Sequence, residues 1–352
     1  MRERSAAMEE AELAARSAGL RYVSDAGPGV RRVRRGKGFS YVGVDGRPVP
    51  AAERRRIEAL AIPPAWTLVW ICPRPDGHVQ ATGRDAKGRK QHRYHPDWRR
   101  VRDATKYERL VDFGAGLPAL RAAVERDLEL PGFPREKAVA LVVSLLDRTL
   151  LRVGNDEYAS SNSSYGLTTL LADHVLVQGS RVTLDFTGKS GKPQRVAVED
   201  RRLARLVRRC SELGGQELFS YLDGDRVCDV GSADVNDYLR QRTGAEVTAK
   251  HFRTWGGTCA AAAALLLCRP PATAKQAETQ VIAAVDVAAC VLGNTRAVCR
   301  SSYVHPAVLD AHASGALQEA WQRARTTERA TRAERTVLSV LQRAAGDLLL
   351  SG

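Results

Sequence analysis

The chain has 352 residues, 44% of them apolar, and a formal net charge of +14. This length accommodates two domains of ordinary size, and the apolar content excludes a globally disordered chain. Residues 1–100 carry 21 Lys and Arg against 11 Asp and Glu, whereas the other 252 residues carry 33 against 29. A concentrated basic segment is typical of proteins that bind a polyanion, most often nucleic acid, although a solvated basic surface gives the same balance.

The sequence offers no signal for export, membrane insertion or disulfide bonding. The first 20 residues are charged and lack the apolar core of a secretory signal. The longest apolar run, from Cys259 to Cys268, is about half of the roughly 20 residues that a membrane span needs, so we interpret it as a buried helix. The seven cysteines are widely spaced and form no C-x-x-C motif. We therefore expect a soluble, cytoplasmic protein of bacterial type without structural disulfides.

The first region of the chain has the pattern of a small β domain. Residues 1–19 are predicted to form a tail or a short helix. Residues 20–100 contain short apolar stretches separated by turn residues, including two Asp-Gly dipeptides at Asp45-Gly46 and Asp76-Gly77, which is the pattern of β-hairpins. The segment KQHRYH supplies a further strand, and AAERRRIEALAI predicts a short helix between the hairpins. We therefore expect residues 20–100 to form a small, strongly basic, mostly β domain.

Residues 101–352 are predicted to form a larger, mainly helical domain, because apolar residues there recur at helical spacing. One interruption, residues 174–200, predicts three short strands with turns near Gly179 and between Gly188 and Lys192. Residues 317–350 predict two amphipathic helices. The predicted fold class is α+β: a small, mostly β N-terminal domain, a linker near residues 99–105, and a helical domain that carries a three-stranded antiparallel sheet.

Two familiar kinds of site are not supported by the sequence. Residues 187–190 read Thr-Gly-Lys-Ser, like the end of a nucleotide-binding phosphate loop, but Thr183 stands where that loop needs glycine, and strand residues follow instead of a helix. His92 and His95 have no nearby set of cysteines and carboxylates to complete a zinc site. We therefore predict neither a nucleotide cofactor nor a metal.

Three cations and one tyrosine remain as candidates for chemistry. They are Arg152 in LLRVGNDEY, Lys189 in DFTGKSGK, Arg253 in TAKHFRTWGGT and Tyr303 in VLGNTRAVCRSSYVHP. Each of them alone has an ordinary interpretation as a surface, turn, ion-pairing or core-edge residue. Together and in this order they resemble the type IB DNA topoisomerases in their short poxvirus-like and bacterial form. The resemblance runs from about residue 20 to about residue 310 and includes DGHVQATGRDAKGRKQHRYHPDW in the first region.

The resemblance implies an isomerase that relaxes supercoiled duplex DNA without ATP or metal. Tyr303 would cleave one strand through a 3′-phosphotyrosyl intermediate, the duplex would swivel, and the strand would be resealed. Arg152 and Arg253 match arginines that pair with the non-bridging phosphate oxygens, a role that suits a planar, permanently charged guanidinium. Lys189 matches the general acid that protonates the leaving 5′-oxygen.

The sequence departs from the family pattern at two positions. Asn294 stands where most members have histidine, and its amide can donate a hydrogen bond to a phosphate oxygen without carrying a charge. We therefore include Asn294 in the catalytic set. His92 stands where poxvirus members have tyrosine, so stacking or a phosphate contact is expected to survive while the preference for a DNA sequence changes.

The resemblance also implies a set of DNA contacts. They are Arg84, Lys87, Arg89, Lys90, Gln91, His92 and Tyr94 in the first region, and Tyr158 and Lys250 near the scissile bond. Cations of this kind position the phosphates, whereas Gln91, His92 and Tyr94 are suited to reach base edges. We expect a monomer that closes around duplex DNA and is associated with the nucleoid.

Two other classes of protein stay open on the sequence alone. A tyrosine site-specific recombinase shares the Arg, Lys, His or Asn, Arg and Tyr arrangement, but usually has a helical first domain and an H-x-x-R motif. A non-catalytic DNA-compacting protein would explain the charge, but would not require Arg152, Arg253 and Tyr303 in this order. Relaxation of a plasmid in EDTA without ATP separates all three classes.

Overall fold

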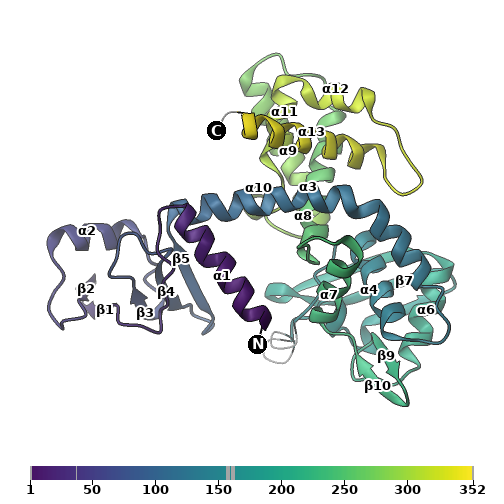
Figure 1. Cartoon of the computed structure of the whole chain (residues 1–352), viewed down its shortest axis with the longest axis horizontal. Coiled ribbons are helices and arrows are strands. Elements are labelled where there is room, and N and C mark those ends of the chain that lie inside the picture. Colours follow the sequence, from purple (N-terminus) through teal and green to yellow (C-terminus); the bar gives the residue numbers. More distant parts are fainter. Residues whose placement is uncertain (1, 37, 156–158, 160–162, 351–352) are drawn as a thin grey trace. The chain divides into compact units, whose positions relative to one another are not determined.

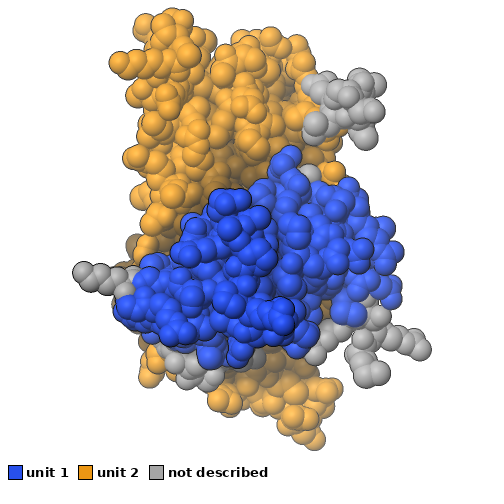
Figure 2. Space-filling model, turned by 90° about the vertical axis from the view of Figure 1, so that its left-hand side faces the viewer, with its two compact units in different colours: residues 1–106 blue, residues 107–352 orange. Residues whose placement is uncertain are grey.

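The computed structural model describes residues 2–36, 38–155, 159 and 163–350. The chain divides into two compact units, unit 1 (residues 1–106) and unit 2 (residues 107–352), which are considered one at a time (Figure 2). The boundary falls within the long helix α3 (Pro96–Asp127). The expected linker near residues 99–105 is therefore wrong: no glycine or proline interrupts the sequence from Asp97 to Phe113, and the helix continues through it.

Unit 1 contains a five-stranded antiparallel sheet with the strand order β2-β1-β3-β4-β5 (Figure 1). Its strands are β1 (Val30–Arg35), β2 (Gly38–Val42), β3 (Thr67–Ile71), β4 (Val79–Arg84) and β5 (Lys90–Tyr94). Helix α2 (Ala51–Ala59) covers one face of the sheet, because its buried Ile57 packs against Val30, Ile71 and Ala81. The N-terminal helix α1 (Arg2–Ser17) packs through Ala15 against Trp98 at the start of α3.

The predicted hairpins of unit 1 are only partly confirmed. Strands β3 and β4 pair across the Asp76-Gly77 turn, and β5 pairs with β4, as the sequence predicts. Beyond the Asp45-Gly46 turn, by contrast, the return segment makes only a single bridge, from Pro48 to Val42. Strand β1, VRRVRR, was not predicted, because its arginines hide the alternation of apolar and polar residues that marks a strand.

Unit 2 is mainly helical and holds the predicted three-stranded antiparallel sheet, in the order β6-β7-β8. These strands are β6 (Val175–Gln178), β7 (Arg181–Gly188) and β8 (Lys192–Glu199). The helices that follow α3 are α4 (Arg135–Thr149), α6 (Arg201–Ser211), α7 (Ser232–Thr243), α8 (Lys250–Leu266), α9 (Ala274–Leu292), α10 (Arg296–Ser302), α11 (Pro306–Ser314), α12 (Ala316–Arg323) and α13 (Arg332–Leu350). The α+β prediction is thus confirmed.

The sequence-based view of unit 2 needs one correction. Residues after the three-stranded sheet were expected to be helical throughout, but β9 (Ser220–Asp223) and β10 (Arg226–Asp229) form a hairpin. Its turn contains Gly224, which has a left-handed φ of +59°. The Asp223-Gly224 dipeptide is therefore a turn signal that the expectation of continuous helix overlooked.

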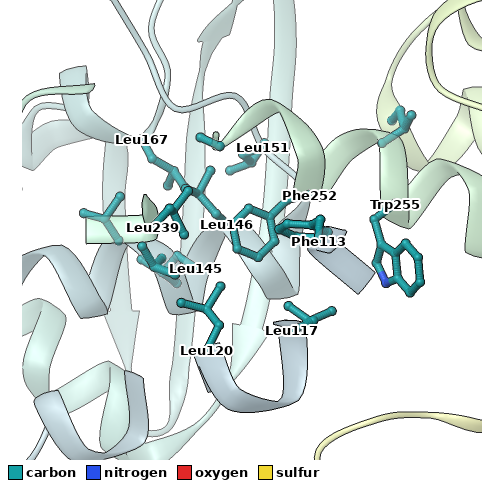
Figure 3. Close-up of a cluster of buried hydrophobic side chains, with 14 of the residues drawn as sticks. Phe113, Leu117, Leu120, Leu145, Leu146, Leu151, Leu167, Leu239, Phe252 and Trp255 are labelled. Carbon is teal, nitrogen blue, oxygen red and sulfur yellow. The ribbon is translucent and has the colours of Figure 1, made fainter. Parts of the chain in front are cut away.

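Helix α8 lies in the core of unit 2 (Figure 3). Its Phe252 meets Phe113 of α3 edge to face, with the ring centroids 4.9 Å apart. Its Trp255 packs so closely on α3 that a Cβ added at Gly114 would lie 2.3 Å from the indole ring. The interpretation of the run beginning at Cys259 as a buried helix is confirmed, since Ala261 and other residues of this run are buried in α8.

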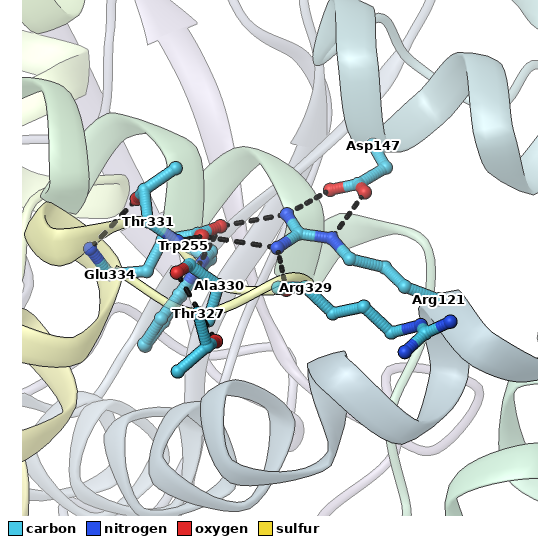
Figure 4. Close-up of polar contacts among 8 residues, drawn as sticks. All are labelled: Arg121, Asp147, Trp255, Thr327, Arg329, Ala330, Thr331 and Glu334. Atoms are coloured by element: carbon cyan, nitrogen blue, oxygen red, sulfur yellow. Dashed lines mark hydrogen bonds and ion pairs between the residues drawn. The ribbon is translucent and has the colours of Figure 1, made fainter. Parts of the chain in front are cut away.

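A partly buried ion-pair network joins the C-terminal helix α13 to this core (Figure 4). Arg121 of α3 donates two hydrogen bonds to Asp147 of α4, at 2.7 and 3.0 Å, and two to Glu334 of α13, at 3.0 and 2.7 Å. The indole Nε1 of Trp255 also donates to Glu334, at 3.4 Å. One carboxylate of α13 therefore holds both α3 and α8.

No single described helix is long and apolar enough to cross a membrane; α9 and α10 pass that test only as a pair, and a bend of 97° separates them. Within the described part of the chain, no three residues among His, Cys, Asp and Glu are grouped so as to hold a metal ion.

Candidate active site

Arg253 of α8 is 5% exposed and lies beside the ring of Tyr303, with its guanidinium carbon 5.2 Å from the ring centroid. Its Nη1 group donates to the backbone carbonyl of Leu150, and its Nη2 group donates to the carbonyl of Leu292 at 2.8 Å. Among the described residues, no carboxylate lies within ion-pair distance of Arg253. Carbonyl partners orient the guanidinium but leave its positive charge uncompensated.

The turn before Arg152 packs closely against α8, the helix that carries Arg253. Leu150 follows the end of α4 with a left-handed φ of +54°, which is unusual for a residue other than glycine. A Cβ added at Gly256 would lie 2.3 Å from the Leu150 side chain, so the lack of a side chain there lets α8 approach this turn. The sequence WGG in α8 thus sets how close Arg152 comes to Arg253.

Arg152 and Asn294 are joined directly. Nη2 of Arg152 donates to Oδ1 of Asn294 at 2.8 Å. Asn294 lies in the turn between α9 and α10, directly after Gly293, whose φ of +62° ends α9. Because its oxygen already accepts a hydrogen bond, Asn294 has only its Nδ2 group to offer as a donor.

Two donors of this cluster are buried without an acceptor. Nδ2 of Asn294 and Nε of Arg253 have no hydrogen-bond partner among the residues that the structure describes. The thiol of Cys299 lies nearby: burial raises its pKa, while Arg253, a contact with the Asn294 amide and the charge of Arg152 oppose that rise. A thiol is only a weak acceptor, so both donors are suited to an anion.

The pKa of the Tyr303 phenol is lowered by these cations. Burial alone would raise its pKa, but the charge and proximity of Arg253, with the charges of Arg152 and Lys250, lower the pKa below the ordinary value of 10.0. Lys250 is the exposed first residue of α8. The structure therefore brings together four of the predicted residues, Arg152, Lys250, Arg253 and Asn294, around the predicted Tyr303.

Lys189 is exposed at the tip of the β7–β8 hairpin, where Ser190 and Gly191 both have left-handed φ values, +67° and +72°. Among the contacts that the structure describes, none joins Lys189 to the Tyr303 cluster. The first part of β8, close to that tip, does reach it: a Cβ added at Gly293, next to Asn294, would lie 3.5 Å from the amide of Gln194. The sequence carried no signal for Gln194.

In unit 1, three of the predicted DNA contacts lie on one face of β5. Side chains alternate along a strand, so Lys90, His92 and Tyr94 point the same way. The rings of His92 and Tyr94 are stacked, with centroids 5.5 Å apart and planes within 7°. Asp25 lies on this face as well, 2.6 Å from the Lys90 ammonium, and it accepts a hydrogen bond from Thr82 at 2.8 Å.

The other predicted contacts of unit 1 surround the turn between β4 and β5. Arg89 and Gln91 both donate to the carboxylate of Asp85, at 2.8 and 3.0 Å, and the hydrogen bond from Arg89 is the main reason that the pKa of Asp85 falls to about 2. Arg84 donates to the carbonyl of Gly88 at 2.6 Å, and Lys87 is exposed. The predicted contact Tyr158 lies outside the described residues.

Tyr303 lies beside a buried arginine, and a second arginine nearby is bound to an amide, in a helical unit with a three-stranded sheet. This arrangement is suited to phosphodiester transfer onto tyrosine. Comparisons with known proteins agree. Residues 95–330 match the family described as "Eukaryotic DNA topoisomerase I, catalytic core", and residues 38–85 match "Bacterial DNA topoisomerase IB, N-terminal domain". The DNA topoisomerase 1B of Acanthamoeba polyphaga mimivirus is 33% identical over 285 residues, which cover 78% of this chain and 85% of the viral protein.

The chain belongs to the type IB DNA topoisomerases. It is accordingly an isomerase that acts on DNA, and the resemblance inferred from the motifs is confirmed. Neither the recombinase nor the DNA-compacting interpretation is favoured by these matches.

Proposed function

We propose that the protein relaxes supercoiled duplex DNA by cleaving one strand with Tyr303 and resealing it, with no need for ATP or metal. The observation that carries this proposal is the convergence of Arg253, Arg152 and Lys250 on one phenol, which lowers its pKa although burial works against them. A phenolate is the form of tyrosine that attacks phosphorus, and a cationic pocket favours it.

The proposed step forms a bond between the Tyr303 oxygen and phosphorus and breaks the bond from phosphorus to the 5′-oxygen. Lys189 donates the proton that the leaving oxygen needs. Charge that grows on the non-bridging oxygens is met by Arg152, Arg253 and the Nδ2 group of Asn294, and loss of one such donor typically costs ~10²–10³ in rate. The phosphotyrosyl ester is close in energy to the diester it replaces, so the reverse attack reseals the strand.

Unit 1 supplies the grip in this proposal. Lys90, with Arg84, Lys87 and Arg89 at the neighbouring turn, would position phosphates, while His92, Tyr94 and Gln91 would approach the bases. Tyr158 and Lys250 would contact the backbone near the scissile bond. We propose that one protein molecule closes around the duplex as a monomer, and that the protein acts on the nucleoid in the cytoplasm, where its substrate lies.

The test is relaxation of negatively and positively supercoiled plasmid in EDTA without ATP, together with trapping of the covalent adduct. The wild-type protein is expected to relax both plasmids and to form a 3′ adduct. Tyr303→Phe is expected to do neither while its affinity for duplex DNA stays close to that of the wild type, because binding is spread over many phosphates.

A matched control is Tyr165→Phe, which removes the hydroxyl of another partly buried tyrosine in unit 2 and is expected to leave relaxation intact. Relaxation by the Tyr303→Phe protein at the wild-type rate would rule the proposal out. Recombinant products that require paired sites would point to a recombinase, and binding that never yields an adduct would point to a DNA-compacting protein.

A further inference from the structure

The hydroxyl group of Thr258 on α8 contacts the backbone on both sides of the residue that follows Tyr303. Thr258 is fully buried. Its oxygen accepts a hydrogen bond from the N–H of His305 at 3.1 Å. Its single hydrogen is shared between the carbonyl of Tyr303, at 3.2 Å, and the carbonyl of Thr254 in its own helix, at 2.7 Å. One hydroxyl of α8 thus bonds to the chain just before and just after Val304.

Other contacts also hold the chain around Tyr303: the hydroxyl of Tyr107 donates to the carbonyl of Val304 at 3.5 Å, and the Tyr107 ring lies against that of His305. Tyr303 is the residue at which α10 ends, and its N–H and that of Val304 both donate to the carbonyl of Cys299, at 2.9 and 3.0 Å. His305 begins the next helix, α11, and its ring accepts from the N–H of Ala307 at 3.1 Å. The linkage between the two helices is therefore held by α10, Tyr107 and Thr258, and among the hydrogen bonds of the described residues the one to the Tyr303 carbonyl comes from Thr258.

The same helix also sets the position of Arg253. Thr258 follows Arg253 by five residues, which in a helix corresponds to ~7.5 Å along the axis. Gly257 stands between them, and a Cβ there would lie 2.9 Å from the Tyr303 carbonyl oxygen and 3.4 Å from the Tyr303 Cβ. The backbone of α8 therefore packs directly on the backbone of Tyr303, and Thr258 fastens the two together.

We propose that Thr258 is a positioning residue for strand cleavage: its hydroxyl fixes the Tyr303 backbone on α8, so that the phenol is held in register with Arg253. This inference rests on the proposed role of Tyr303 as nucleophile. An attacking group that shifts by about 1 Å can lose ~10²-fold in rate without any loss of substrate binding. Loss of the Thr258 hydroxyl should therefore slow the chemical step and leave the affinity for DNA unchanged.

Thr254 provides a matched comparison on the same helix. It is 1% exposed, and its hydroxyl donates only within α8, to the carbonyl of Lys250 at 3.4 Å. Thr254→Val and Thr258→Val remove the same atom from two equally buried sites. Any general cost of placing valine in α8 is common to both variants, so a difference between them reports the contact with the Tyr303 segment.

The experiment is single-turnover cleavage of a suicide duplex at saturating protein, with religation, equilibrium binding to an uncut duplex and Tm measured alongside. Thr258→Val is expected to cleave and religate about 10–100-fold more slowly, within the range for a displaced reacting group, with unchanged Kd. Thr258→Ser keeps the hydroxyl and is expected to retain most of the rate. Thr254→Val is expected to cleave like the wild type.

Two outcomes overturn the proposal: equal cleavage rates for Thr258→Val and Thr254→Val, or a Thr258→Ser protein as slow as Thr258→Val. If Thr258→Val does not fold, Gly257→Ala displaces the same backbone while the Thr258 hydroxyl stays, and wild-type cleavage by that variant overturns the proposal instead. Failure of the proposed function is distinct, because it shows as a covalent adduct that persists in Tyr303→Phe, whatever the Thr258 variants do.

Discussion

Beside β5 in unit 1, a predicted DNA-binding cation lies against a carboxylate, whereas in unit 2 the arginines near Tyr303 lie against backbone carbonyls and an amide. Lys90 is half exposed and pairs with Asp25 at 2.6 Å. Arg253 is buried and donates to two carbonyl oxygens, and Arg152 donates to Asn294. Both places hold cationic side chains, a lysine in unit 1 and two arginines in unit 2, and their partners differ.

The difference in partners separates two uses of positive charge. An ion pair whose cation is half exposed to solvent is worth little, roughly 0–1 kcal/mol, and Thr82 stays as a hydrogen-bond partner of Asp25 when a DNA phosphate takes Lys90. A buried arginine that is oriented by carbonyls keeps its full charge, and burial lowers its pKa, as does the charge of Arg152. The partner of a cationic side chain thus indicates better than the side chain itself whether the cation binds DNA or takes part in catalysis.

After loss of the nucleophile itself, the largest expected effect in unit 2 is that of Lys189→Ala, which should slow cleavage by ~10²–10⁴ because the leaving oxygen then departs without a proton. Lys189 is exposed on its hairpin, unlike Arg253, so this variant tests whether an exposed cation takes part in the reaction. A suicide duplex with sulfur in place of the scissile 5′-oxygen should restore much of the rate. A variant equally slow on both substrates would mean that Lys189 positions DNA instead.

Arg253→Gln should lower the cleavage rate by ~10²–10³ while the affinity for duplex DNA stays near that of the wild type. The pH dependence should change as well. The pKa of Tyr303 is now lowered, so the rising limb of the rate against pH lies below the ordinary phenol range; without Arg253 the pKa rises and the limb moves to higher pH. Single-turnover rates across pH measure both effects, and an unmoved limb would contradict the assigned role of Arg253.

Asn294→Ala should lower the cleavage rate by ~10²-fold, because one donor to the phosphate is lost and Arg152 loses its acceptor. Asn294→His should remain active, since an imidazole N–H can replace the amide. An amide does not titrate, so the difference between wild type and the Ala variant should not depend on pH, whereas the His variant should respond near neutral pH. Full cleavage by the Ala variant would exclude Asn294 from the catalytic set.

The smallest expected effect belongs to unit 1. Asp25→Asn releases Lys90 from its carboxylate and should tighten binding to duplex DNA a few-fold, with the salt slope steeper by ~0.9, the value for one more phosphate contact. The cleavage rate at saturation should not change. Asp45→Asn, at an exposed turn of the same unit, is the matched control for one negative charge. An equal shift in Kd for the two variants would show that only net charge matters.

The sequence was sufficient for the parts of the molecule that rest on local patterns. Strands β3 to β8 follow turn signals and alternation, and the order of Arg152, Arg253 and Tyr303 identified the family. Strand β1 was not predicted because its arginines conceal the alternation of apolar and polar residues. The length of α3 was not predicted because a boundary between compact units was assumed to need a linker. Sequence periodicity does not record where a continuous helix leaves one compact unit and enters another.

The contacts that define the site could not be predicted in the same way. Arg253 is oriented by the carbonyls of Leu150 and Leu292, and every residue has a carbonyl, so no residue type marks such a partner. Thr258 is one threonine among many until α8 packs on the Tyr303 segment. Asp25 lies 65 residues before Lys90 in the sequence, and only the folded sheet brings them together.

The network at Arg121 has a consequence for the order in which the protein is made. Glu334, which binds both Arg121 and Trp255, lies 31 residues after Tyr303. A growing chain that has already released Tyr303 from the ribosome therefore still lacks the carboxylate that fastens α8 to α3. Since domains tend to fold as units during synthesis, the packing of α8 on α3 gains this carboxylate only after Glu334 has been made and released.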